Sequence, residues 1–286
     1  MSTISPHITE FGTVDEEVDA VSMHRYCRSR NYVEKHASAI QSSSLLADAG
    51  LDANFRESIQ IGLDTVRMNT VPALLAIFSM VILALMYAVF PFFENTLNQI
   101  AILKSNLGPA FAFFGMGLTV GFLSEYMKLR RSATRRWTRS NTVNFLFMFM
   151  MFGVIATAKD PIYYLLANIY GEGTSFSIIL RKVMFDQFAW TLFLVCPAQT
   201  FLFAWKAHGF SGKSLRAECP SFSEFFALKI MPALIINWSY WLPASAIIFC
   251  FPTELQLAVS IMAVSIWIIS LNCFAPSYRS IHLAGK

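Results

Sequence analysis

Residues 230–278 read IMPALIINWSYWLPASAIIFCFPTELQLAVSIMAVSIWIISLNCFAPSY and contain one charged residue, Glu254. A helix that crosses the ~30 Å hydrocarbon core of a bilayer needs about 20 largely apolar residues. These 49 residues are therefore far too many for a single crossing. Because proline ends helices and favours turns, Pro252 predicts a tight hairpin between two membrane-spanning helices.

Four more charge-free stretches of this kind precede the hairpin. Lipid offers the backbone no hydrogen bonds, so such stretches must be helical, and the alternating pattern of a membrane barrel is absent. We predict an all-α protein, a polytopic transmembrane helical bundle of about six spans and no fewer than four. The segment 160–180 is too short to span and is expected to be an interfacial connection. The expected spans are 68–93, 105–124, 140–158, 187–205, 230–253 and 255–278.

Composition supports a membrane protein with a polar N-terminal arm. Hydrophobic residues make up 55% of the chain and charged residues only 14%, against roughly a quarter charged in soluble proteins. This excludes a water-soluble enzyme, a disordered protein and a secreted disulfide scaffold. Three parts are expected: a polar arm over 1–67, the helical bundle over 68–278 and a short tail over 279–286.

The arm itself is predicted to be largely helical. Its composition suits a helix over about 14–48 that ends near Gly50. An apolar stripe at helical spacing follows, which would lie on the membrane surface or pack against the bundle. The stripe consists of Leu51, Phe55, Ile59, Leu63 and Val66.

Lysine and arginine gather on alternate loops. The loops on one side hold 14 of these residues and the loops on the other side hold 4. Since cytoplasm-like compartments retain Lys and Arg, both termini are expected on the positive-inside side of the lipid bilayer. The basic loop over 125–140 is expected to contact anionic lipid headgroups rather than nucleic acid.

Asp186 is the acid closest to the interior of an expected span. It precedes Gln187 at the start of the span 187–205 and follows Lys182 by four residues. Acids in membrane segments are costly and often functional, which favours a pore or gating role. A carboxylate at a helix start also gains from the helix dipole, which favours a cap or an ion pair. The sequence leaves both roles open.

Other polar residues have ordinary structural uses. Glu125 and the turn Lys159-Asp160-Pro161 are expected to be interface anchors at the ends of spans. Side chains inside spans most often make interhelical hydrogen bonds of roughly 0.6–2 kcal/mol. These polar residues are Asn144, Gln199, Thr200, Asn237, Ser239, Ser245, Ser260, Ser265 and Asn272.

Gly117 and Gly121 form a GxxxG step in an apolar stretch. Because glycine has no side chain, two helix backbones can approach closely at such a step. We expect these glycines to serve helix packing inside the subunit, and a homo-oligomer seam is the alternative.

No pattern of catalytic or metal-binding residues is visible. The five cysteines include no CxxC pair and no spacing to histidine typical of a metal site. We therefore expect no metal, no cofactor and no catalytic residue, and predict that the protein is not an enzyme. An intramembrane enzyme would need a second ionisable residue that meets Asp186 at membrane depth.

A series of residues between about 105 and 275 has the order and spacing of a known family. The series is Gly115-Met116-Gly117, Met151-Phe152-Gly153, Pro161, Tyr163-Tyr164-Leu165, Lys182 with Asp186-Gln187, Glu218-Cys219-Pro220 before Pro232, and Pro252 fifteen residues before Trp267. In this series the chain resembles the Mpv-seventeen / peroxisomal-membrane-protein-twenty-two family of multi-pass membrane proteins. It departs from that family at two charged positions: the family's acid falls on Leu118 and its late arginine on Gln256.

The resemblance implies a function and a location. The family is usually described with four spans and is proposed to form channels or to affect the permeability of membranes to small solutes and metabolites. It implies the mitochondrial inner or the peroxisomal membrane, and a bacterial inner membrane is the alternative. In a channel or transport-related protein, the residues nearest the path would be Asp186, Gln187, Asn237 and Trp267, in a polar cavity lined by the second, fourth and fifth spans. The rival hypothesis is a non-transporting scaffold or adaptor that recruits a partner through the N-terminal arm.

Overall fold

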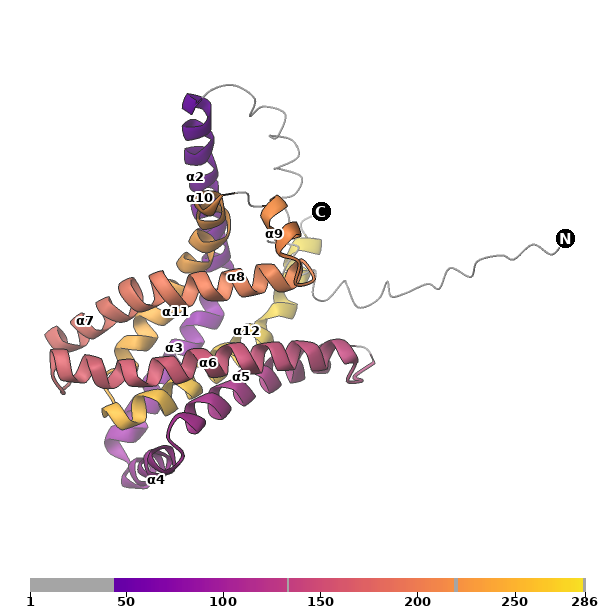
Figure 1. Ribbon diagram of the computed structural model, residues 1–286. Coiled ribbons are helices and arrows are strands. Elements are labelled where there is room, and N and C mark those ends of the chain that lie inside the picture. Colours follow the sequence, from indigo (N-terminus) through magenta and orange to yellow (C-terminus); the bar gives the residue numbers. More distant parts are fainter. Residues whose placement is uncertain (1–43, 133, 219–220, 285–286) are drawn as a thin grey trace. The chain divides into compact units, whose positions relative to one another are not determined.

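The computed structural model describes the backbone of residues 44–132, 134–218 and 221–284, and the side chains of 55–132, 134–217 and 221–272 (Figure 1). All regular structure in these ranges is helical. Packing divides the chain into Met1–Ala53 and Asn54–Lys286. Of the first unit, only the helical residues 44–53 are described.

Six helical segments are long and apolar enough to cross a membrane, which confirms the predicted all-α bundle of about six spans. The protein is therefore a multi-pass integral membrane protein. In spans four and five, a π-helical segment lies between two α-helical segments. The spans are α3 (Thr70–Val89), α5 (Pro109–Arg131), α6 (Arg139–Tyr170), α7–η1–α8 (Phe176–Phe185, Asp186–Val195, Cys196–Ala207), α10–η2–α11 (Phe222–Phe225, Phe226–Ile230, Met231–Ile248) and α12, which runs from Thr253 to Ala284.

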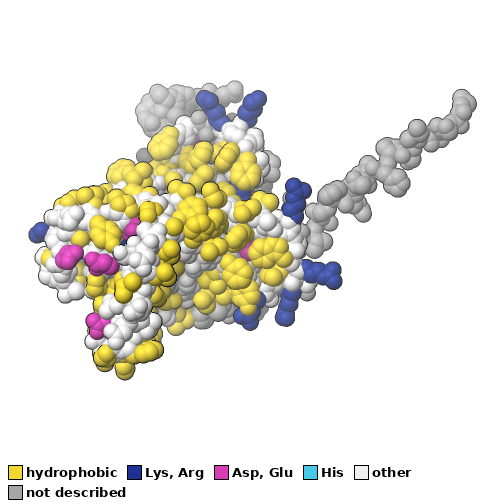
Figure 2. Space-filling model, turned by 60° about the horizontal axis from the view of Figure 1, so that its bottom comes forward, with side chains coloured by type: hydrophobic (Ala, Val, Ile, Leu, Met, Phe, Trp, Pro, Cys, Tyr) yellow, Lys and Arg dark blue, Asp and Glu magenta, His cyan; other side chains and the backbone are white. Residues whose placement is uncertain are grey.

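The surface has the pattern that lipid requires. Figure 2 shows a broad hydrophobic face, with most Lys and Arg at one end and Asp and Glu at the other. Large apolar side chains such as Leu74, Phe78 and Phe122 are more than half exposed. A soluble protein rarely leaves so much contiguous apolar surface in water, whereas lipid tails cover it at no cost.

Turn chemistry sets the ends of the spans. Gly108 adopts a φ of 55°, which residues with a side chain rarely do, and Pro109 then opens α5. The predicted hairpin at Pro252 is present, because α11 ends at Ile248 and α12 begins at Thr253. We call the three connections α3–α5, α6–α7 and α11–α12 the hairpin end of the bundle, and the opposite end the basic end.

α4 (Pro91–Leu107) was not predicted from the sequence. It joins α3 to α5 at the hairpin end and is seen nearly end-on in Figure 1, so it runs across the spans. Pro91 at its first turn removes only a backbone N–H that a helix start leaves unpaired anyway. α4 contains charged residues, including Glu94 and Lys104, so a search for charge-free stretches does not find it.

The expectation of an interfacial connection over 160–180 is wrong. α6 continues through Pro161 to Tyr170, and α7 begins at Phe176 after a connection of only five residues. Tyr163, which lies in this segment, is buried in the bundle. Proline lacks only one backbone N–H, so a helix held by neighbours on both sides can run through it.

The arm also differs from expectation. The helix does not end near Gly50, because α2 runs from Ser44 to Met68, and residues 14–43 lie outside the described part. Ser58 and Gly62 are buried; of the predicted stripe, Phe55, Ile59 and Val66 are half-buried and Leu63 is exposed, so its position on the membrane surface or against the bundle stays a prediction. A Cβ at Gly62 would lie 2.9 Å from Cδ1 of Ile235 in α11, so residues 54–67 pack with the bundle.

The tail expected over 279–286 is not a separate element as far as it is described. The backbone of residues 279–284 continues α12, and residues 285–286 lie outside the described part.

α5 and α6 pack side by side along their length, and glycine permits it. A Cβ at Gly117 would lie 2.6 Å from the carbonyl oxygen of Phe149, and a Cβ at Gly121 would lie 3.0 Å from that of Phe145. Gly153 makes the reciprocal approach to Phe113. The GxxxG step is therefore used inside the subunit.

A polar clamp closes the basic end of this pair. Glu125 is fully buried; its carboxylate pairs with Lys128 at 3.0 Å and accepts a hydrogen bond from Nδ2 of Asn141 at 2.8 Å. Asn141 also completes the capping box with Thr138 that starts α6. Glu125, expected to be an interface anchor, thus connects two helices.

We expect Gly117→Ala to destabilise the bundle. The new methyl group must push the α6 backbone away, and overpacking of this kind costs about 1–3 kcal/mol. Gly115→Ala is the matched control, because its Cβ would meet only the flexible end of Ile261. Thermal unfolding in detergent measures both variants. Equal melting midpoints would contradict the close backbone approach.

Candidate functional site

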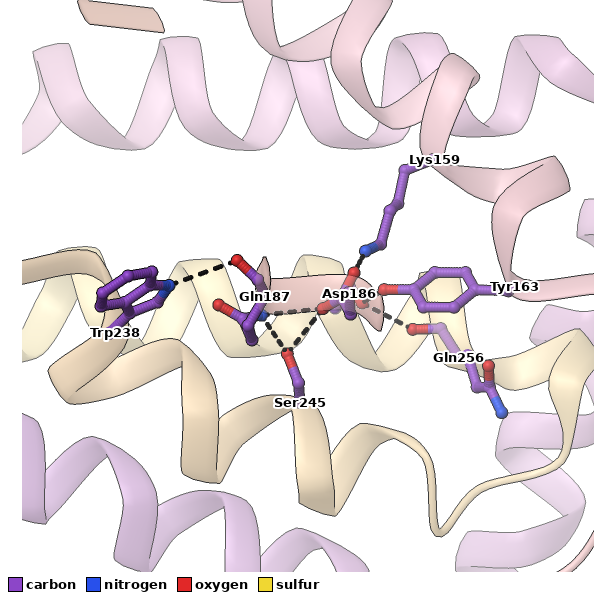
Figure 3. A network of polar contacts seen from close by, with 8 residues as sticks. Lys159, Tyr163, Asp186, Gln187, Trp238, Ser245 and Gln256 are labelled. Carbon is purple, nitrogen blue, oxygen red and sulfur yellow. Dashed lines mark hydrogen bonds and ion pairs between the residues drawn. The ribbon is translucent and has the colours of Figure 1, made fainter. Parts of the chain in front are cut away.

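A lysine and an aspartate from two different spans form an ion pair inside the bundle. Nζ of Lys159 in α6 contacts Oδ1 of Asp186, the first residue of η1 (Figure 3). Their side chains are only 14% and 5% exposed. Since an unpaired charge would be very costly in this setting, each residue stabilises the charge of the other.

The second carboxylate oxygen of Asp186 is held by hydrogen bonds. Oδ2 accepts from Nε2 of Gln187 at 2.8 Å and from Oγ of Ser245 in α11 at 3.0 Å. Nε2 of Gln187 also donates to Oγ of Ser245 at 2.9 Å. Trp238 donates its indole N–H to the backbone oxygen of Gln187 at 3.3 Å. Both oxygens of the carboxylate are thus engaged.

Aromatic rings surround the lysine. Nζ of Lys159 lies 5.1 Å from the ring centre of Tyr163 and 5.9 Å from that of Trp190. Cations are attracted to the faces of such rings, more strongly where water is excluded. The rings therefore supplement the ion pair without adding a second negative charge.

A neighbouring chain of hydrogen bonds leads to α12. Tyr163 and Ser260 lie 2.6 Å apart through their hydroxyl oxygens, and Ser260 donates its one hydrogen to the backbone oxygen of Gln256 at 2.8 Å. Tyr163 is therefore the donor to Ser260. Gln256 in turn donates from Nε2 to the backbone oxygen of Phe251 in the hairpin at 3.0 Å. We use the name polar centre for seven residues: Lys159, Tyr163, Asp186, Gln187, Ser245, Gln256 and Ser260.

Three helical segments supply Asp186 and its partners, and each has a proline or a π-helical segment within two residues of the side chain that it supplies. Pro161 follows Lys159 by two residues inside α6, and Pro243 precedes Ser245 by two residues inside α11. Asp186 begins the π-helical segment. Prolines interrupt the helical hydrogen-bond ladder, and π-helical segments occur frequently at functional sites. The helices are therefore least regular where they meet.

A second ion pair lies next to the first. Asp160, the residue after Lys159, pairs at 2.7 Å with Lys104 of α4. Nζ of Lys104 also donates to the hydroxyl of Tyr164 at 3.3 Å and to the backbone oxygen of Glu254 at 3.2 Å. This pair fastens the crosswise helix to α6 and to the start of α12.

The structure brings together only part of the predicted site. Asp186 and Gln187 meet in the polar centre, but Asp186 pairs with Lys159 rather than Lys182. It does not cap a helix, because α7 leads into it without a break. It faces neither a water-filled cavity nor headgroups, since the residue is 96% buried in protein.

The other two predicted residues lie elsewhere. Trp267 stacks on Tyr240 with ring centres 4.4 Å apart. Asn237 is half-buried in α11, eight residues or about 12 Å along the helix from Ser245. The polar centre takes its residues from α6, η1, α11 and α12, and a cavity lined by the second, fourth and fifth spans stays a prediction.

Sequence reasoning missed Lys159 as a site residue because Lys-Asp-Pro is a sequence typical of a turn at the end of a span. A signal was present: Lys159 and Asp160 are the only charged residues between Arg139 and Glu172. Charges inside an otherwise apolar stretch of helix length indicate partners in the membrane. Ser245 was predicted only as one of several polar residues that make interhelical hydrogen bonds, and it does so with Asp186 and Gln187. Gln256 was not predicted as a site residue.

No group of three or more His, Cys, Asp or Glu side chains that could hold a metal ion occurs among the residues whose side chains are described. Both carboxylates near the polar centre are occupied by lysines. The arrangement is thus suited to fixing charge and hydrogen-bonding groups in place inside a membrane.

Comparison with known proteins gave no relatives. No protein-family model matches the chain, and neither a curated protein nor a solved structure matches it. The functional argument therefore depends on the residues of this chain.

A double-mutant cycle tests the ion pair. We expect Lys159→Met and Asp186→Leu each to cost roughly 3–5 kcal/mol, because each leaves one buried charge unpaired. The double variant should recover most of this loss, and Lys182→Met combined with Asp186→Leu should not. Chemical or thermal unfolding in detergent measures the coupling. Additive losses for the Lys159 and Asp186 changes would show that the pair does not form.

Proposed function

We propose that this protein is a channel or transport-related protein through which small polar solutes cross a membrane, with the polar centre as the site that the solute meets. The observation that carries the proposal is the Lys159–Asp186 pair, two charges buried together among apolar spans. Ionisable residues inside membrane segments are rare and commonly mark pathways for ions and substrates.

The irregular helices support movement at this site. Transporters often bind their substrates where spanning helices are interrupted, because the freed backbone groups can serve the substrate. Here Pro161, the start of η1 and Pro243 all lie within two residues of the groups that contact one another. Purely structural ion pairs need no such interruption.

The polar centre lies nearer to the hairpin end. Lys159 is 20 residues, about 30 Å, from the start of α6 at the basic end. Ser245 is three residues, about 5 Å, from the end of α11 at the hairpin. The described conformation is closed around the centre, so passage requires the helices to separate, with the longer part of the path toward the basic end.

Kinship to the Mpv-seventeen family is part of the proposal. Several residues that carry the resemblance lie in or beside the polar centre: Pro161, Tyr163, Lys182, Asp186 and Gln187. A shared site is a natural reason for a shared series of residues. Mitochondrial inner, peroxisomal or bacterial inner membranes remain the predicted locations. The absence of enzyme activity remains a prediction, while Lys159 is a second ionisable residue that meets Asp186, as an intramembrane enzyme would need.

We also propose that both termini lie on the positive-inside side. The four cations at the hairpin end are exceptions to the charge rule, and burial accounts for most of them. Lys104 and Lys182 are buried, Lys159 is 14% exposed, and two of the three are ion-paired. Only Arg181 is an exposed cation there, so the charge difference between the two ends is larger than the count of residues indicates.

The proposed partners follow from the same asymmetry. The exposed arginines Arg130, Arg131, Arg135, Arg136 and Arg139 suit anionic lipid headgroups. Gly117 and Gly121 are used within the subunit, so a homo-oligomer would need another surface. A scaffold that recruits a partner through residues 1–43 remains the alternative, and these residues lie outside the described part.

Single cysteines test the orientation. In a variant whose five natural cysteines are replaced by alanine, we expect Glu172→Cys at the hairpin end to react with a membrane-impermeant maleimide in intact cells or organelles. Thr134→Cys at the basic end should react only after permeabilisation. Both positions are exposed, so access decides the result. The reverse pattern would place the termini on the other side.

Flux into liposomes tests the transport function. Vesicles that contain the purified protein should release small polar solutes faster than protein-free vesicles. The Lys159→Met, Asp186→Leu double variant should release them at least roughly tenfold more slowly, because loss of the charged groups removes the polar site. Its melting curve confirms that it is folded. Wild-type vesicles that release no solute above the protein-free background would refute the transport proposal.

A further inference from the structure

Two buried amide oxygens in the polar centre lack a hydrogen-bond donor within the described part of the chain. They are Oε1 of Gln187 and Oε1 of Gln256. The two residues are 2% and 1% exposed, so bulk water does not reach them. Figure 3 shows Gln187 beside Asp186, whereas the amide of Gln256 lies farther off and points away from Asp186.

The orientation of both amides is fixed by their nitrogen atoms. Nε2 of Gln187 donates one hydrogen to Asp186 and the other to Ser245. Nε2 of Gln256 donates to the backbone oxygen of Phe251. Turning either amide over would place its oxygen against another acceptor. The unpaired groups are therefore acceptors in both cases.

Unpaired buried acceptors imply a ligand that donates hydrogen bonds. Buried polar groups in native proteins are nearly always paired, and internal water fills the role where protein groups do not. Water, small alcohols and small amides all provide the O–H or N–H group that Oε1 of Gln187 and Gln256 lacks.

The charges of the polar centre disfavour ions as ligands. Lys159 is compensated by Asp186, and Lys104 by Asp160. A cation that enters would lose its hydration and meet Lys159, with no free carboxylate to bind it. Moving an ion into a site without a free opposite charge is far more costly than moving a neutral polar molecule.

Lys182 is the one charge that could favour an anion. It is 2% exposed, lies one helical turn from Asp186 toward the hairpin end, and makes no contact ion pair with a described residue. Exposed Glu172 in the α6–α7 hairpin attracts it electrostatically. An anion drawn to Lys182 would next meet the carboxylate of Asp186 and the amide oxygen of Gln187, both of which repel it.

We infer that the polar centre accepts neutral, hydrogen-bond-donating small molecules and excludes ions, with Oε1 of Gln187 and Gln256 as the acceptors that a passing molecule uses. This inference rests on the transport function proposed above and specifies its substrate class. Water and small polyols or amides share the required chemistry.

Stopped-flow light scattering of liposomes with the full-length protein tests this inference. One arm follows osmotic water flow with sucrose outside, a second follows glycerol and urea, and a third follows potassium and acetate. We expect water, glycerol or urea to cross well above the protein-free rate, and potassium and acetate to stay at that rate. Water flow without glycerol or urea flow identifies water as the donor and supports the inference.

Variants assign the acceptors. Gln187→Leu and Gln256→Leu should each slow the neutral molecules by roughly tenfold, the factor that corresponds to one hydrogen bond. Gln199→Leu, a half-buried glutamine in the same span as Gln187, is the matched control and should leave the rate unchanged. Gln187→Met serves as a second variant of similar length if Gln187→Leu does not fold.

The outcomes separate this inference from the transport function. Potassium or acetate flux comparable to that of glycerol overturns the substrate class while transport stands. Full glycerol or water flux in folded Gln187 and Gln256 variants overturns the assignment of the acceptors. The absence of flux in every arm refutes the proposed function itself.

Discussion

Charge in lipid must be compensated by a partner, and this constraint organises the interior of the protein. Lys159 and Asp186 belong to two different spans. Either charge would be very costly in the bundle without the other. Their pairing fixes α6 against η1 at one level. Gln187 and Ser245 then extend the same contact to α11, so that one carboxylate holds three spans together.

The fold places this contact where its helices are least regular. Pro161 and Pro243 weaken the hydrogen-bond ladders of α6 and α11, and η1 widens the helix that carries Asp186. Elsewhere the bundle is held by close packing. Glycines bring α5 close to α6, and residues near the start of α12, such as Leu255 and Val259, are buried. Rigid contacts thus surround a polar centre with freer backbone, an arrangement suited to binding and passage.

The positions of the lysines show how one physical rule can conceal another. A count of charges treats every lysine as a determinant of the protein's orientation in the membrane. Lys104 and Lys159, however, form ion pairs with aspartates, which neutralise their charges. Burial therefore separates cations that can respond to the membrane's charge asymmetry from cations that cannot. The charges are paired, but the amide oxygens of Gln187 and Gln256 have no hydrogen-bond donor among the described residues. Such a site favours neutral molecules that donate hydrogen bonds.

The sequence by itself determined the fold class, the six spans, the hairpin at Pro252 and the glycines of the GxxxG step, because apolar length and turn residues are properties of neighbouring positions along the chain. It indicated Asp186 and Gln187 through the cost of an acid in a membrane. Tertiary structure alone decided that Lys159 is the partner of Asp186 and that Ser245 and Gln256 join them, since these contacts connect residues 27 to 97 positions apart. Such pairings depend on helix rotation and crossing, which the packing of whole helices sets and no local pattern records.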